Sequence, residues 1–89
     1  MSWWRPDTYA RIVEISVDKQ NFPDTFKEWR KLAQKQFDTL RAEGLPVVKI
    51  VIDPDELLAW ATSLGRNVDA KTRIEFALRT YERSKGGIN

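Results

Sequence analysis

Apolar residues recur every three or four positions across residues 22–43, and this spacing predicts a helix with one wide hydrophobic stripe. Gly44 is expected to end this helix, and Pro46 prevents it from restarting. Residues 22–43 are therefore the most regular helical segment of the chain. The stripe consists of Phe26, Trp29, Leu32, Ala33, Phe37 and Leu40.

Two capping pairs are available at the start of this helix. Asn21 can pair with Asp24, and Thr25 can pair with Glu28 in the same three-residue spacing. In each pair the first side chain accepts a hydrogen bond from a backbone amide that has no partner inside the helix. Both starting points remain open on the sequence.

Residues 47–52 change the pattern, because nearly all of them are β-branched and apolar. Such a run predicts a short strand. Its side chains alternate between two faces, and only Lys49 interrupts their apolar character. We therefore expect both faces of this strand to be covered.

Two more helices are expected after the strand, over residues 54–64 and 70–83. Asp53 is the expected N-cap of the first, and Gly65 is expected to end it. Asp69 is the expected cap of the second. The predicted buried stripe of this last helix consists of Ala70, Ile74, Ala77, Leu78 and Tyr81.

Residues 11–17 fit two interpretations. Their β-branched residues favour a strand, while helical spacing from Tyr9 onward also fits a helix. A strand over 47–52 needs a pairing partner, because an unpaired strand edge exposes backbone polar groups. The partner is expected to be residues 11–17 of the same chain, or residues 47–52 of a second copy.

The expected fold is thus a small α+β domain that spans residues 1–89. It would hold a two-stranded sheet and three helices, with a frayed tail at 84–89. The aromatic rings of Trp3, Trp4 and Tyr9 could form a binding surface, but the favoured expectation is that they pack onto the domain and hold the first residues in place.

The amino-acid composition excludes several kinds of catalytic chemistry. The chain has 89 residues, no cysteine and no histidine, which excludes thiol nucleophiles, disulfides and imidazole acid–base catalysis. We expect a non-enzyme without metal, cofactor or small-molecule substrate. No apolar run reaches the length of a membrane span, and no signal-peptide pattern is present, so a cytoplasmic protein without a membrane partner is expected.

Charge is nearly balanced, with a formal net charge of +2, but it is unevenly distributed. Cations lie on the side of the 22–43 helix opposite its apolar stripe, and Asp38 is the one acidic residue among them. Such a face would suit a phosphate backbone or an acidic partner, although most charged helix faces are simply solvated. These cations are Lys27, Arg30, Lys31, Lys35 and Arg41.

Residues 48–81 resemble ribbon-helix-helix proteins, particularly the antitoxins of small bacterial toxin–antitoxin pairs. The resemblance covers a little over a third of the chain. It begins with V-x-I-x-I-D at 48–53 and D-P-D at 53–55, and continues through Ala59-Trp60 and Gly65. It ends with T-R-I-x-x-x-L-R-x-Y at 72–81.

That resemblance implies a homodimer whose two strands pair antiparallel in the major groove of DNA. The outward strand residues would be Val47, Lys49 and Val51, and Lys49 would contact base edges. The backbone near Lys71 and Thr72, at the start of the last helix, would hold a phosphate.

The whole chain also looks like small uncharacterised phage and bacterial proteins. They share an I-D-P-D-E-x-L-A-W stretch, present at 52–60, and an R-x-E-F-A element, present at 73–77. This likeness implies a phage or bacterial origin, and it gives no indication of an activity.

Two hypotheses follow for a non-catalytic binding module. One is a dimeric DNA-associated regulator of antitoxin type. The other is a protein–protein interaction domain that does not bind DNA.

Overall fold

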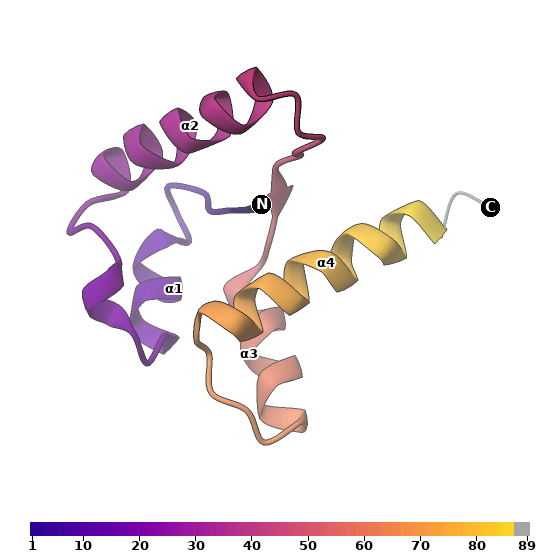
Figure 1. Ribbon diagram of the computed structural model, residues 1–89. Coiled ribbons are helices and arrows are strands. Elements are labelled where there is room, and N and C mark those ends of the chain that lie inside the picture. The colour runs from indigo at the N-terminus through magenta and orange to yellow at the C-terminus, as the bar shows by residue number, and fades with distance from the viewer. Residues whose placement is uncertain (87–89) are drawn as a thin grey trace.

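The computed structural model describes residues 1–86, and the side chains of residues 1–83. Within this range the chain forms four α-helices, one short 3-10 helix and two short strands (Figure 1). The helices are α1 (Tyr9–Ile15), α2 (Phe26–Ala42), α3 (Pro54–Ser63) and α4 (Ala70–Gly86), with a 3-10 turn at Lys19–Asn21. The strands are β1 (Ser2–Trp3) and β2 (Ile50–Val51). The α+β class is thus confirmed, with one helix more than expected.

The two strands pair in parallel, with Ser2 opposite Ile50 and Trp3 opposite Val51. The amide of Ile50 donates to the carbonyl of Met1 at 2.9 Å, and the amide of Ile52 donates to that of Trp3 at 3.3 Å. The partner of β2 is therefore the start of the same chain, which neither interpretation of the sequence had expected. The strand itself is also shorter than the predicted 47–52.

The prediction of a strand over residues 11–17 is wrong, because Tyr9–Ile15 form α1. Tyr9 and Ile12 lie on its inner face, and both side chains are buried. This burial against the core outweighs the β propensity of Ile12, Val13 and Ile15, since strand propensity depends on the surroundings. The helix ends at Ser16, where the backbone becomes extended.

The ends of the other helices follow local signals. The amide of Glu28 donates to Thr25 Oγ1 at 3.1 Å, so Thr25 caps α2, and the Asn21–Asp24 alternative is wrong. Asp53 Oδ1 accepts from the amide of Asp55 at 2.8 Å and caps α3 as predicted. Asp69 caps α4, as predicted. At its other end, α4 continues to Gly86 rather than ending at 83, and the rest of the expected tail lies outside the described residues.

The core lies where α1, α3, the inner side of β2 and the first half of α4 meet. The expected anchoring of the first residues is confirmed. Trp4 and Tyr9 are buried, and the ring of Trp3 lies 5.0 Å from that of Trp29 on α2. The core side chains are Trp4, Tyr9, Ile12, Ile52, Leu57, Ala61, Val68, Phe76 and Ala77.

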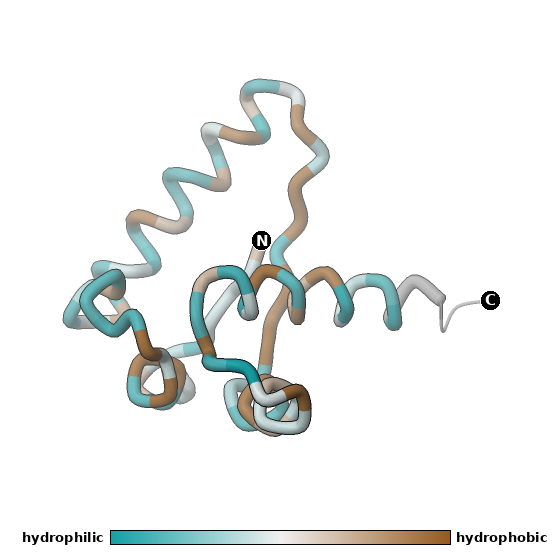
Figure 2. The backbone as a smooth tube through the Cα atoms, turned by 60° about the horizontal axis from the view of Figure 1, so that its bottom comes forward, coloured by the Kyte–Doolittle hydropathy of each residue, from teal (hydrophilic) through white to brown (hydrophobic). Residues whose placement is uncertain are grey.

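The molecule is flat and open, with extents of 39 × 37 × 21 Å. Figure 1 shows α2 and α4 leaving the core in different directions, with β2 and the segment before it between them. In Figure 2 this segment is a largely hydrophobic trace that runs from the end of α2 to α3. Every helix within residues 1–86 is too short or too polar to cross a membrane.

Candidate functional site

An apolar groove lies between α4 and the extended segment before β2. It has a volume of about 570 Å³. Leu45, Val48 and Ile50 line one wall, and Ile74, Leu78 and Tyr81 of α4 line the other. We call this surface the apolar groove.

The α4 wall departs from the sequence prediction. Ile74, Leu78 and Tyr81 were expected to face the core, but their exposed fractions are 67%, 56% and 42%. Ala70 is exposed as well, whereas Ala77 is buried as predicted, together with Phe76, which the predicted stripe did not include. This helix has two apolar faces, and the core covers only one of them.

The opposite wall of the groove is also exposed. Val48 on this wall is 47% exposed, and Val51, which borders the neighbouring hollow, is 55% exposed, so the expectation that both faces of the strand are covered is wrong. In a parallel pair, alternate residues point their amides and carbonyls away from the neighbouring strand. Val51 is such a residue, and within residues 1–86 its backbone amide and carbonyl have no hydrogen-bond partner. The outer edge of β2 is thus free.

Lys49 is turned toward α2 rather than outward. Its Nζ donates to Gln34 Oε1 at 2.6 Å and lies 4.2 Å from the ring centroid of Trp3. The ring of Phe37 is also close, at 4.8 Å. A cation between two aromatic faces is held by their quadrupoles. This side chain therefore joins the first strand to α2.

The basic face of α2 is open to solvent. Its five cations are exposed, and none of them forms an ion pair with any described residue. Arg41 lies over the ring of Phe37 at 5.8 Å. We use the term basic face for Lys27, Arg30, Lys31, Lys35 and Arg41.

The start of α4 is already capped by a carboxylate. Asp69 Oδ1 accepts the amide hydrogen of Thr72 at 2.8 Å, and the hydrogen bonds from Thr72 lower the pKa of Asp69. The side chain of Thr72 is buried, whereas Lys71 beside it is exposed. The amide expected to hold a phosphate thus has an internal acceptor.

No family model, curated protein or solved structure matches this chain.

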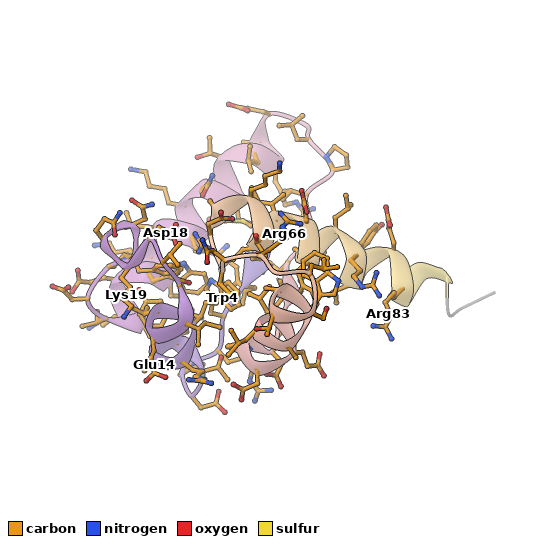
Figure 3. The ribbon with its side chains drawn as sticks, turned by 90° about the horizontal axis from the view of Figure 1, so that it is seen from below. Trp4, Glu14, Asp18, Lys19, Arg66 and Arg83 are labelled. Atoms are coloured by element: carbon orange, nitrogen blue, oxygen red, sulfur yellow. The ribbon has the colours of Figure 1, made fainter. Side chains whose placement is uncertain are left out.

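The most buried ion pair among residues 1–83 was not expected from the sequence. Arg73 Nη1 lies 2.7 Å from Asp18 Oδ1, and Nη2 lies 2.6 Å from Oδ2. The guanidinium also donates to Ser16 Oγ at 3.2 Å and lies 4.8 Å from the ring of Phe22. Figure 3 shows Asp18 beside Lys19, close to the end of α1. No local pattern signals this pair, because 55 residues separate its members.

A second pair engages the other side of α4. Arg66 donates to Glu75, and its hydrogen bonds lower the pKa of the Glu75 carboxyl. The Arg66 guanidinium also lies 5.7 Å from the ring of Trp60. Arg73 and Glu75 are thus engaged within the chain, whereas Lys71 and Glu82 belong to none of the ion pairs among residues 1–83.

Proposed function

We propose that this protein is a non-catalytic protein-binding module of the cytoplasm, and that the apolar groove is its binding surface. The exposed strip of Ile74, Leu78 and Tyr81 carries the proposal. Contiguous exposed apolar surface of this kind marks interaction sites in soluble proteins. The facing wall, with Leu45 and Val48, turns the strip into a groove that can receive an amphipathic helix.

The side chains of the groove support binding rather than catalysis. Its lining is almost wholly apolar, and the hydroxyls of Ser2 and Tyr81 are its polar side-chain groups. The acidic residues at the start of α3 have structural roles, since Asp53 caps the helix and Asp55 accepts from Arg11 at 2.9 Å. The sequence also contains no histidine or cysteine.

A photo-crosslinking amino acid at position 78 tests this function in cells. We expect covalent adducts with protein from position 78, because a bound partner would cover that side chain. Leu32 is the matched control, since it is 60% exposed but lies on α2 outside the groove. Equal yields from positions 78 and 32, or no adduct from either, would contradict the proposal.

The basic face supports a second candidate, a DNA-associated regulator of antitoxin type. Five exposed cations on one helix can follow a phosphate backbone. The ribbon-helix-helix form of this candidate receives less support, because Lys49 is turned toward α2 and the Thr72 amide is bonded to Asp69.

Duplex binding at two salt concentrations tests this candidate. We expect affinity to fall steeply as salt rises, and the double variant Lys31→Gln/Lys35→Gln to weaken binding about tenfold at low salt. Lys19→Gln is the matched control, since this exposed cation lies in the 3-10 turn Lys19–Asn21, away from α2 and from the start of α4. No binding at low salt would remove DNA from consideration.

A further inference from the structure

We propose that the occupant of the apolar groove is a second copy of this chain. In this dimer the two α4 helices lie antiparallel across a two-fold axis, each against the strip of Ile74, Leu78 and Tyr81 on the other. The inference rests on the proposed function, since it names the partner of the same groove.

The exposed area of the chain is the first argument. Its accessible surface is 6299 Å², whereas a folded monomer of 10.4 kDa is expected to expose about 5,400 Å². The excess of roughly 900 Å² is close to the ~800 Å² that each partner buries in an interface of standard size. The radius of gyration is also larger than expected, at 13.4 Å compared with about 12 Å for a chain of this length.

The charges at the ends of the strip are the second argument. Successive residues of an α-helix are turned by about 100°, so Lys71, Ile74, Leu78 and Glu82 share one side of α4. Lys71 lies toward the start of this side and Glu82 toward its end, about 16 Å apart along the axis. Both are exposed, and both are free of ion pairs among residues 1–83.

An antiparallel arrangement would form two symmetric ion pairs from these charges. It places Lys71 opposite the partner's Glu82, and Glu82 opposite the partner's Lys71. A parallel arrangement would instead bring like charges together. A two-fold axis also closes the assembly, because each copy offers the same patch that it receives. The mixed signs at the ends of the strip disfavour a nucleic acid or a strongly charged peptide in this groove.

The free edge of β2 adds to the area that such a dimer would cover. A hollow of about 320 Å³ separates this edge from Thr80 and Tyr81, and Tyr81 borders the apolar groove as well. The β2 edge and the α4 strip are therefore parts of one continuous surface. Covering it would shield an exposed strand edge, which is otherwise prone to unwanted pairing.

Sedimentation equilibrium over a range of concentrations tests the dimer. We expect a mass twice the 10.4 kDa of one chain at high concentration. Leu78→Glu should produce a monomer, and Leu32→Glu, with a comparably exposed leucine on α2, should leave the mass unchanged. Circular dichroism verifies that both variants stay folded. A monomer at every concentration, or a dimer that Leu78→Glu does not affect, would overturn the proposal.

A charge exchange tests the antiparallel orientation. Lys71→Glu and Glu82→Lys should each weaken the dimer about tenfold, because each change places like charges opposite one another twice. The double variant Lys71→Glu/Glu82→Lys should restore the affinity to within about threefold of the original chain. Absence of restoration would overturn this orientation.

The crosslinking experiment separates failure of the dimer from failure of the binding function. Adducts from position 78 with a different protein, together with a monomeric purified chain, would leave the groove as a binding surface and remove the dimer. No adduct of either kind would remove both.

Discussion

The guanidinium of Arg73 on α4 holds the carboxylate of Asp18 through two hydrogen bonds, of 2.7 and 2.6 Å. Both side chains are largely buried, with 11% and 14% of their surface exposed. The pair joins the segment after α1 to α4 across 55 residues of sequence. It is thus the best-defined polar link between the two halves of the chain.

Arg73→Lys should lower the free energy of unfolding by on the order of 1–2 kcal/mol. Lysine keeps the positive charge but loses the planar fork that bonds both carboxylate oxygens. Urea unfolding of this variant, of Asp18→Asn and of the double variant measures the coupling between the two residues. Additive effects of the two single changes would show that the pair contributes no coupling energy.

The ion pair of Asp18 and Arg73 should also make the stability of the protein depend on pH. The hydrogen bonds from Arg73 lower the pKa of Asp18 to about 2, below the value of ~3.9 expected in the unfolded chain. The unfolded state therefore takes up this proton first as pH falls, so the stabilisation is complete above about pH 4 and is lost on the way down to about pH 2.

The measurement is urea unfolding of the original chain and of Asp18→Asn between about pH 5 and pH 2. We expect the difference in their unfolding free energies to shrink as pH falls, since the asparagine does not titrate. Other carboxylates affect both proteins alike, and their contributions cancel in the difference. A difference that stays constant over this range would contradict the lowered pKa of Asp18.

Trp3 should contribute to stability through its contacts with Trp29 and Lys49, at 5.0 Å and 4.2 Å. We expect Trp3→Ala to cost about 2 kcal/mol, from lost aromatic burial and the lost cation–ring contact. Lys49→Gln should cost less, about 0.5–1 kcal/mol. Thermal unfolding compares both with Lys19→Gln, an exposed lysine that lies over none of the aromatic rings of residues 1–83. An unchanged melting temperature in Trp3→Ala would mean that β1 is not held by these contacts.

Gly65 ends α3 with a φ of +65°, and an added Cβ would meet no atom within 4 Å. The cost of Gly65→Ala is therefore conformational alone, and we expect about 1 kcal/mol. Gly65→Asn should cost less, because asparagine tolerates left-handed backbone better than alanine does. Chemical unfolding of the two variants measures both effects. Equal stability of Gly65→Ala and the original chain would contradict the positive φ.

Local chemistry alone determined several parts of this protein. The sequence predicted α3 within one residue of its end, because Asp53 and Gly65 act on neighbouring backbone groups. It also predicted the capping of α4 by Asp69 and the tethering role of the first aromatic residues. Each of these depends on residues only a few positions away, or on rings that must be buried somewhere.

Only the tertiary structure decided the rest. The local sequence pattern could not show that β2 pairs with residues 2 and 3, because a strand can form the same backbone hydrogen bonds with any other extended segment. It could not show that Tyr9 and Ile12 pack as a helix, because burial outweighed the strand propensity of the segment. Finally, α4 is apolar on two sides, and periodicity cannot tell which side meets the core. The fold turned Phe76 and Ala77 inward and left Ile74, Leu78 and Tyr81 exposed in the apolar groove.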